Sequence, residues 1–439
     1  MNEQLFEAMA NVLRINDREK FTIPAEGLYP HQWLWDSCFI AIGLRHMDTS
    51  RAQTEIISLL RGQWSNGMLP HMIFADGDEH KRDRDIWRSS VSPYAPDDVA
   101  TTGITQPPMM AEAIWRVGEK LPPTERRTWF LKVLPALIRH HEWLYADRDP
   151  HNEGLVLQIH PYETGLDNTP PWISELHKHS KPWWATFIEK TGAVKLVDLL
   201  RRDTSHLPPG QRMSNMDALL YFAAVKRIKR KGYNTEAILS RSLFCIEDVS
   251  FNSIFIRSNK ILRDIAKAVR HELPEELLDN MRRSEDSIEQ FWDAYSGSYF
   301  SRNFITHKHI KEPSIATLLP LYSGVISKER AAHLVSKLKN QQEFGTRFPI
   351  PSVPVSSSWF KELGYWQGPS WINTNWLIID GLRRYGYHAE ADAITKRTLK
   401  MVEISGSYEY FNPLDGSPAG AKNFSWTAAL IMDMIKNSR

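Results

Sequence analysis

Asp167 stands in a turn-rich segment whose composition suits acid–base chemistry. Gly165 before it and the pair Pro170-Pro171 after it predict a shaped loop rather than a helix or a strand. The apolar neighbours Leu166 and Trp172 would remove water from the carboxyl group and so raise its pKa. A raised pKa is what a general acid needs at neutral pH.

Two other interpretations of this segment stay open at the level of sequence. Asp167 or Asn168 could form an Asx-turn, in which the side chain bonds its own backbone. Glu163, four residues earlier, is a local competitor for the role of acid.

A second acidic residue, Glu409, lies between Tyr408 and Tyr410 in the strand-like run 407–411. A period of two places Glu409 on one face of the run and both tyrosines on the other. A carboxylate within an aromatic strand is costly unless it is hydrogen-bonded or used in a reaction. The alternative is an exposed edge strand that carries a solvated Glu409.

Two carboxyl groups are the minimum set for hydrolysing a glycosidic bond. One donates a proton to the leaving oxygen, and the other activates water or attacks the anomeric carbon. If water is activated, the two groups should lie roughly 6.5–9.5 Å apart, whereas direct attack requires about 5 Å.

Aromatic side chains in turns predict a site for sugars. The chain has 16 Trp, 14 Tyr and 18 Phe, and many of the tryptophans stand beside Gly, Pro and Asn. Sugars suit such a setting, because their C–H faces stack on rings and their hydroxyl groups need polar partners. The alternative is a large helical core that uses tryptophan for packing.

The segments densest in aromatic and polar side chains are 29–36 with Trp33, Trp35 and Asp36, then 63–72, and 364–376 with Trp366, Gln367 and Trp371. Asp36 could instead cap the helix that follows it.

The elements that must position these residues are mostly helices. Helical periodicity predicts helices over 2–14, 50–63, 107–118, 125–146, 215–231, 248–270, 274–292, 328–340, 369–385, 387–403 and 424–437. Residues 154–160 and 407–411 are short extended candidates. Helical hairpins in this number can close into an α/α barrel, and a stacked solenoid is the alternative, although it would need a fixed repeat that the sequence lacks. We expect one all-α domain over 1–439, in which the non-periodic stretch 64–106 covers the site.

Composition and motifs exclude several classes of protein. The 54 basic and 52 acidic side chains nearly balance, so no sequence-wide charge favours nucleic acid or a membrane surface. The basic run 226–231 is better explained as cations at a helix end before Gly232. Phosphate-loop, dinucleotide and zinc motifs are absent, so we expect no metal and no bound nucleotide. An acidic start, two cysteines (Cys38 and Cys245) and the lack of a long apolar run predict a cytoplasmic protein. The expected partner is a small-molecule glycoside, and a homo-oligomer stays open.

Six motifs in order resemble the bacterial mannosylglycerate and glucosylglycerate hydrolases of glycoside hydrolase family 63. They are residues 32–36, 63–71, 102–108, 165–170, 365–371 and 408–410 followed by 424–429. The resemblance runs from about residue 28 to the end. It implies an (α/α)6 barrel and an inverting α-glycosidase without a cofactor, in which Asp167 is the general acid and Glu409 the general base. The positions it implies for sugar binding are Trp33, Trp35, Asp36, Gln106, Tyr365, Trp366, Gln367 and Trp371.

A hydrolase that acts on a glycerate needs a cation to bind the carboxylate, and arginine does this best. Arg212, within 211–217, is the candidate, but Asp217 would repel a carboxylate. The resemblance therefore implies a small α-glucoside or α-mannoside more strongly than it implies a glycerate, with 2-O-α-mannosyl- or glucosyl-D-glycerate as the first candidate. A neutral aglycone such as glycerol or a second sugar stays open.

Two other functions remain compatible with the sequence. A sugar epimerase or isomerase on the same kind of barrel would use histidine, and His31, His71 and His160 are available. It would interconvert reducing sugars without cleavage. A non-catalytic sugar-binding protein would bind glycosides and release no product.

Overall fold

Six helices form a closed ring, in which each contacts the next and the last contacts the first. In order around the ring they are α2 (Leu34–Leu44), α5 (Met110–Gly118), α12 (Val249–Val269), α14 (Pro320–Ser323), α16 (Ile372–Arg384) and α18 (Ser425–Asn437). This computed structural model describes residues 2–178, 207–208, 210–240 and 244–437. The predicted (α/α)6 barrel is confirmed, and the solenoid alternative is wrong.

Most residues of the six ring helices are buried. Every residue of α2 is buried, and so are most residues of α16 and α18. A helix that is apolar all round must be covered on all sides. That cover is supplied by a second layer of helices with one buried stripe, as α3 (Thr49–Leu60) packs on α2 and α17 (His388–Ser405) packs on α16.

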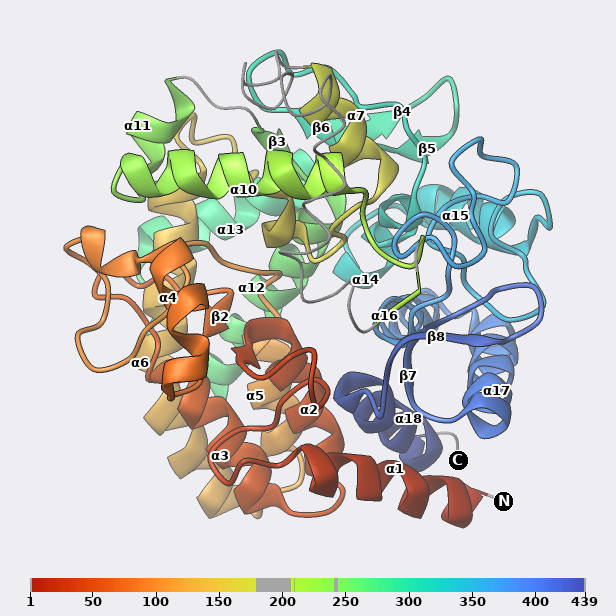
Figure 1. The fold of residues 1–439 in the computed structure, drawn as a ribbon, viewed down its shortest axis with the longest axis horizontal. Coiled ribbons are helices and arrows are strands. Elements are labelled where there is room, and N and C mark those ends of the chain that lie inside the picture. Colours follow the sequence, from red (N-terminus) through yellow and green to blue (C-terminus); the bar gives the residue numbers. More distant parts are fainter. Residues whose placement is uncertain (1, 179–206, 209, 241–243, 438–439) are drawn as a thin grey trace.

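The outer layer and the site end contain the remaining helices. They are α1 (Asn2–Asn16), α4 (Lys81–Trp87), α6 (Pro123–Arg148), α7 (Pro170–Lys178), α10 (Asn215–Arg230), α11 (Thr235–Leu239), α13 (Glu275–Ser287) and α15 (Lys328–Lys339). Helix α1 packs against α18, so the two ends of the chain lie close together in Figure 1.

Four two-stranded antiparallel sheets complete the described part of the chain. β1 (Gln32–Trp33) pairs with β2 (Met72–Ile73), β3 (Ile246–Glu247) with β6 (Arg302–Asn303), β4 (Trp292–Asp293) with β5 (Ser298–Tyr299), and β7 (Tyr408–Phe411) with β8 (Pro418–Lys422). β7 confirms the extended run predicted over 407–411. The run predicted over 154–160 forms only a single bridge, between Gln158 and Ile246.

The helices predicted from periodicity are present, with ends that shift by a few residues. The structure adds α4, α7, α11 and α14, which are too short or too loop-like in composition for a helical period to reveal. Helix α2 begins at Leu34 and not after Asp36, and no side chain of the N-cap residue Trp33 closes it. Asp36 therefore lies in the first turn, and its expected alternative role as a cap is wrong.

Candidate active site

The segments that lead into four helices of the ring meet at one end of the barrel. The side-chain oxygen Oε1 of Gln106, just before α5, accepts the backbone N–H of Trp35 at 3.3 Å. The ring of Trp35 lies 5.5 Å from that of Trp426 on α18 and 6.5 Å from that of Trp366, before α16. The predicted site residues on these segments are thus brought together.

An aromatic floor lies under this end of the barrel. Trp366 and Trp371 stack face to face with ring centroids 3.8 Å apart, and each is 1% exposed. The indole N–H of Trp371 donates to the carbonyl oxygen of Tyr365 at 3.1 Å. The stacked rings of Trp366 and Trp371 hold the segment 365–371 in place. Trp33 and Tyr365 line the cavity next to this segment.

The loop that carries Asp167 is held against the 365–367 segment. Asn168 accepts the backbone N–H of Trp366 through Oδ1 at 2.8 Å, and its carbonyl oxygen accepts from Gln367 Nε2 at 2.9 Å. Gly165 adopts a φ of +72°, and a Cβ there would lie 2.5 Å from the ring of Trp35. The side chain of Asn168 bonds across to another loop, which speaks against a local Asx-turn as its role.

The carboxyl group of Asp167 is surrounded by hydrogen-bonding and charged neighbours. Tyr365 Oη donates to Asp167 Oδ2 at 2.7 Å, and the hydroxyl of Tyr221 donates to the main-chain carbonyl of Asp167. Burial raises the pKa of Asp167 to about 6, against the opposing effects of the Tyr365 hydrogen bond and of Arg212, and Glu409 adds to the rise. A partly buried acid of this kind keeps part of its protons near neutral pH.

Glu409 is placed by an irregularity in the β7–β8 pair. The register shifts between Tyr408 and Tyr410, as a β-bulge produces. Opposite Glu409, Gly420 adopts a φ of +73°, and a Cβ on it would lie 2.6 Å from Glu409 Oε2. The backbone N–H of Ala421 donates to the same oxygen at 3.0 Å. Glu409 is 2% exposed, so the exposed-strand alternative is wrong.

Arg212 binds Glu409 through both terminal nitrogens of its guanidinium group. Nη1 donates to Oε1 at 3.0 Å and Nη2 donates to Oε2 at 2.5 Å. Tyr29 Oη donates to Oε1 as well, at 2.8 Å. The guanidinium carbon lies 4.6 Å from the ring centre of Tyr365, whose hydroxyl bonds Asp167. One arginine and one tyrosine therefore connect the two carboxyl groups.

The loop before α10 is fixed at both ends. Ser214 caps α10 by accepting the N–H of Asp217 at 3.1 Å, and Tyr410 Oη donates to the carbonyl oxygen of Gln211 at 2.5 Å. Asp217 also accepts from the Ser214 hydroxyl at 2.6 Å and lies 2.8 Å from His177. The charge of Asp217 is thus engaged by its own neighbours, which weakens the expected repulsion of a carboxylate at Arg212.

Two neighbouring hollows meet at Arg212. One, of about 360 Å³, is lined among others by Tyr29, Trp33, Asp167 and Tyr365. The other, of about 790 Å³, is lined among others by Asn168, Lys361 and Gln367. The first has the acid and the aromatic walls expected of a sugar site. The second continues past the cation, where a further group of a ligand could lie.

Asp36 and Trp33 offer polar contacts in this region. Burial, reinforced by the negative charge of Glu409, holds the pKa of Asp36 well above its usual range, so that its carboxyl group can donate as well as accept. The indole N–H of Trp33 is buried and has no hydrogen-bond partner in the part of the chain that the structure describes. Gln106 and Gln367, by contrast, already use their side chains to fix the backbone of Trp35 and Asn168.

Glu163 is committed elsewhere and does not compete with Asp167. It is fully buried and pairs with both terminal nitrogens of Arg148, at 2.9 Å each. It also accepts the backbone N–H of Ile159 at 2.7 Å and of Thr105 at 3.2 Å. These partners are Arg148 and backbone groups, outside the network that joins Asp167 to Glu409, so Glu163 supports the loop.

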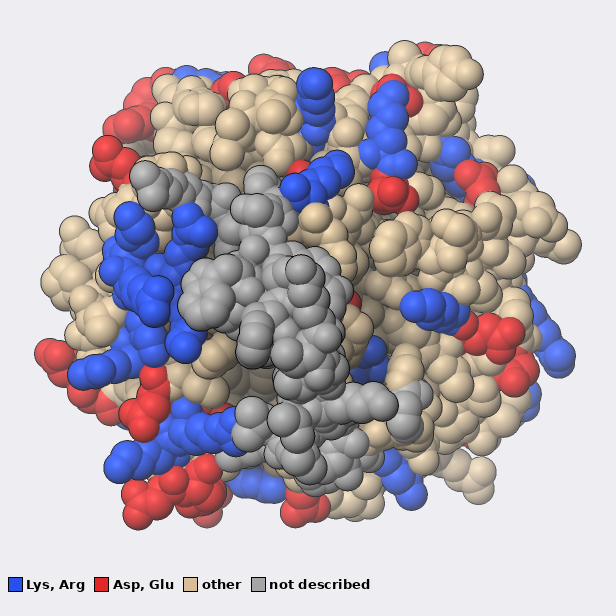
Figure 2. All heavy atoms as spheres, turned by 45° about the horizontal axis from the view of Figure 1, so that its top comes forward, with Lys and Arg blue, Asp and Glu red and all other residues tan. Residues whose placement is uncertain are grey.

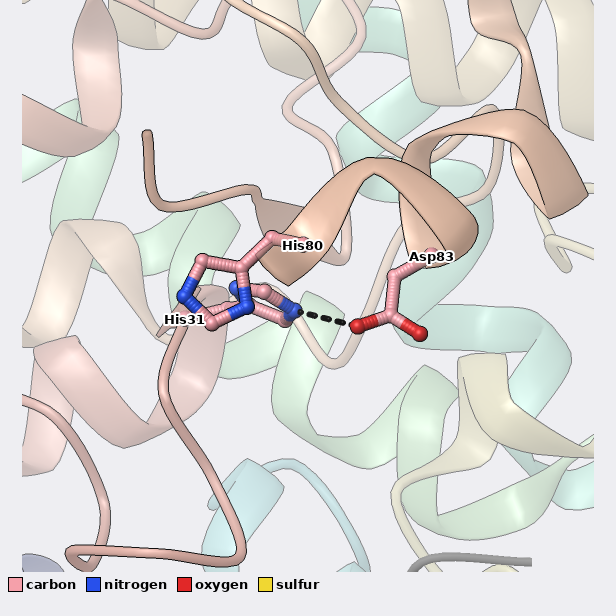
Figure 3. Close-up of side chains that lie close together, drawn as sticks. All are labelled: His31, His80 and Asp83. Atoms are coloured by element: carbon pink, nitrogen blue, oxygen red, sulfur yellow. Dashed lines mark hydrogen bonds and ion pairs between the residues drawn. The ribbon is translucent and has the colours of Figure 1, made fainter. Parts of the chain in front are cut away.

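The histidines named for an epimerase are poorly suited to proton exchange. Burial lowers the pKa of His71 to about 3 and that of His160 to about 4. His31 lies with His80 and Asp83 in a cluster whose possible ligand atoms are within 4.8 Å of one another (Figure 3). However, His31 Nδ1 accepts the backbone N–H of Ala75 at 3.1 Å, which places the proton of the neutral ring on Nε2, facing Asp83 at 3.3 Å. A metal-binding Nε2 would need the opposite tautomer, so the cluster is better explained by hydrogen bonding.

Tyr29 and Tyr221 contact the candidate acids Glu409 and Asp167, although the sequence did not single them out. Tyr29 stands at the start of the 29–36 segment, so its neighbours were the available signal, whereas Tyr221 lies inside α10 with no local cue. Burial raises the pKa of both phenols well above the usual value, which keeps them as hydrogen-bond donors.

Basic side chains gather beside the cavity. Figure 2 shows Lys and Arg crowded at the left of the face it presents, the side on which α4 and α10 lie in Figure 1. Lys81, Arg82, Lys226 and Lys229 line a shallow hollow there, and Arg82 also lines the cavity of Asp167. Lys229 donates to the carbonyl oxygens of Asp85 and Ile86, and thus has a packing role. A positive rim of this kind favours the approach of an anionic ligand.

The sequence run 226–231 ends its helix as predicted. Helix α10 stops at Arg230, and Gly232 follows with a φ of +61°.

Among the described residues, none of the helices combines the length and the apolar character that crossing a membrane would require.

The chain is similar to known glycoside hydrolases over most of its length. Residues 29–427 match the profile of the mannosylglycerate hydrolase MGH1-like glycoside hydrolase domain. The chain is 37% identical to the mannosylglycerate hydrolase of Thermus thermophilus over 96% of its own length and 98% of that protein. It is 29% identical to the glucosylglycerate hydrolase of Mycolicibacterium hassiacum over 98% of each chain.

Solved structures show the same likeness. The crystal structure of the family 63 mannosylglycerate hydrolase from Thermus thermophilus in complex with Tris and D-glycerate superposes with a TM-score of 0.87 at 35% identity, and covers 98% of this chain and 99% of that one. The neutral trehalase of Saccharomyces cerevisiae shares the fold at a TM-score of 0.57 and 18% identity. The resemblance expected from the motifs is confirmed: the chain belongs to the mannosylglycerate hydrolase-like branch of glycoside hydrolase family 63, and it is a glycoside hydrolase.

Proposed function

We propose that the chain hydrolyses a 2-O-α-mannosyl- or 2-O-α-glucosyl-D-glycerate with inversion, with Asp167 as the general acid and Glu409 as the general base. The observation that carries this proposal is the single network from Asp167 through Tyr365 and Arg212 to Glu409. It joins two carboxyl groups with different surroundings, and three of its members, Asp167, Tyr365 and Arg212, line one cavity of about 360 Å³.

The surroundings of Asp167 support its role as the acid. A pKa of about 6 leaves roughly a tenth of the molecules protonated at pH 7, which is enough to donate to the leaving oxygen. Tyr365 orients one oxygen of the carboxyl group and keeps the other for the substrate.

The surroundings of Glu409 support its role as the base. Ala421 and Tyr29 fix its two oxygens from the protein side. In the reaction, Glu409 would take a proton from water while the oxygen of that water bonds to the anomeric carbon. Asp167 would protonate the departing glycerate oxygen as the glycosidic bond breaks.

The sugar and the glycerate would bind on either side of Arg212. Trp33 lines the cavity of Asp167, and we place Trp35, Asp36 and Gln106 at the hexose end next to it, beside Trp366 and Trp371. Arg212 supplies the cation for the glycerate carboxylate, and the positive rim on α4 and α10 favours the approach of that anion. Relatives named for mannosylglycerate and for glucosylglycerate leave both sugars as candidates.

Three further expectations belong to this proposal. The chain acts as a single catalytic domain over 1–439, and the region 64–106 covers the site, as the positions of Met72, Arg82 and Trp87 along the cavity suggest. The enzyme works in the cytoplasm on a small molecule, without nucleic acid or a membrane. Its assembly, as a monomer or a homo-oligomer, can be measured by light scattering.

A substrate panel tests the proposal. Purified protein is incubated with mannosylglycerate, glucosylglycerate, the corresponding glycosyl glycerols, trehalose and free sugars, and hexose release is measured. We expect one or both glycerates to be cleaved fastest. Interconversion of free sugars without cleavage, or binding without any product, would replace the hydrolase by one of the two alternative functions.

A further inference from the structure

The carboxylate of Glu409 has no free acceptor site left. An ionised carboxylate offers about four lone-pair positions. Tyr29 and Arg212 Nη1 occupy those of Oε1, while Arg212 Nη2 and the N–H of Ala421 occupy those of Oε2. A general base must accept a proton from water, so one of these four donors has to leave before Glu409 can act.

Arg212 is the donor best able to leave. The N–H of Ala421 belongs to the backbone of β8, fixed opposite the bulge, and cannot withdraw without breaking the strand pair. Tyr29 contributes one neutral hydrogen bond from a side chain packed edge-on against Trp33 and Phe424. Arg212 contributes two bonds from a long side chain, and it is the donor that a second anion could attract.

The guanidinium group also has an unused donor for that second anion. The Nε atom of Arg212 is buried and has no acceptor among the described residues. The side chain as a whole is 6% exposed. A carboxylate can bind an arginine side-on, through Nε and one Nη. A substrate carboxylate could therefore begin at Nε and then take over a terminal nitrogen from Glu409.

We infer, on the basis of the proposed function, that Arg212 is exchanged between Glu409 and the carboxylate of the substrate, so that an anionic aglycone unblocks the general base. The guanidinium shifts its hydrogen bonds to the substrate, a lone pair of Glu409 becomes free, and water binds there. A neutral aglycone fills the same space and leaves Glu409 blocked. Discrimination against neutral glycosides then appears in kcat and not only in KM.

A glycosyl fluoride separates this exchange from simple recognition of charge. α-Mannosyl or α-glucosyl fluoride carries the sugar but has no aglycone carboxylate. Its leaving group is the fluoride ion, which departs without needing a proton. Water adds to the anomeric carbon, its proton passes to Glu409, and the carbon–fluorine bond breaks. The aglycone side stays empty, so D-glycerate can be supplied as a separate molecule.

We expect the wild-type enzyme to hydrolyse the fluoride slowly, and D-glycerate to accelerate it roughly tenfold, within the usual range of coupling between two sites. Glycerol, which has the same carbon skeleton without the charge, should not accelerate it. Arg212→Met should hydrolyse the fluoride faster than the wild type, and glycerate should no longer change its rate. Lys400→Gln removes an exposed cation that lines neither hollow and should behave as the wild type.

Several results would overturn the exchange. One is that glycerate leaves the fluoride rate unchanged, or lowers it, in an enzyme that cleaves a hexosyl glycerate; this arm needs no variant. Another is that a folded Arg212→Met, checked by circular dichroism, is slower than the wild type on the fluoride. If the wild type cleaves no hexosyl glycerate at all, the proposed function itself is wrong, which is a different result.

Discussion

The hydroxyl group of Tyr365 donates a hydrogen bond to Oδ2 of Asp167 over 2.7 Å. A donor to the charged form of a carboxyl group stabilises that form and lowers its pKa. Tyr365 therefore limits the rise in pKa that burial causes at Asp167.

Removal of this hydroxyl should move the pH profile in one direction. A general acid works when protonated, so activity falls as pH rises through its pKa, which is about 6 for Asp167. In Tyr365→Phe the pKa of Asp167 rises, and we expect the alkaline limb of the kcat profile to shift to higher pH. If the profile moves to lower pH, or does not move, then the alkaline limb does not report the protonation of Asp167.

The two carboxyl groups should respond differently to a leaving group that needs no proton. Asp167→Asn and Glu409→Gln should each lower kcat on the glycoside by about 10²–10⁴-fold, while calorimetry shows nearly unchanged substrate binding. On the glycosyl fluoride, Asp167→Asn should keep most of the wild-type rate and Glu409→Gln should lose it. Equal losses for the two variants on the fluoride would contradict the assignment of acid and base.

Gly420 offers a test of how Glu409 is held. Gly420→Ala adds a Cβ 2.6 Å from Oε2 of Glu409 in a left-handed backbone conformation, whereas Gly386→Ala adds one in a similar conformation with nothing within 4 Å. Both should lower the free energy of unfolding by about 1–2 kcal/mol because of backbone strain. Only Gly420→Ala should also lower kcat, by at least about tenfold. If Gly386→Ala lost activity equally, general destabilisation would explain the effect.

His140 should make stability depend on pH. Burial lowers the pKa of this histidine from 6.5 to about 3, so below pH 6.5 the unfolded chain binds a proton that the folded chain does not. Stability is therefore full above about pH 6.5 and falls as the pH is lowered toward 3, by about 1.4 kcal/mol per pH unit for one such group. In His140→Asn, whose side chain can still accept the N–H of Leu69, the unfolding free energy should fall less steeply between pH 6 and pH 4. An unchanged slope would mean that His140 is not held neutral.

Much of the candidate site can be predicted from the sequence because its residues stand in unusual local contexts. Asp167 and Glu409 were recognisable as acids among turn formers and aromatics, and Trp33, Trp366 and Trp371 by their density. Helices with one apolar stripe, such as α3, were predicted well. Helix α2 was misplaced at its start because it is apolar on every face and has no capping side chain.

The relations between distant segments could not be predicted in this way. From the sequence, Glu163 and Asp167 were equal candidates for the general acid. The ion pair of Glu163 with Arg148, which only the structure shows, favours Asp167. The sequence predicts that Arg212 binds the carboxylate of a substrate. Its neighbours in the sequence do not indicate that it binds Glu409, because that contact depends on how the loop before α10 meets β7 and β8. Tyr221 was missed for the same reason.

The anomer that is released first tests the central assignment most directly. In a freshly started hydrolysis of the α-linked hexosyl glycerate followed by proton NMR, water activated by Glu409 must attack the face opposite the departing glycerate. We expect the β-hexose to appear first and the α-anomer to grow only through mutarotation. Release of the α-hexose first would mean retention, and would contradict the roles given to Asp167 and Glu409.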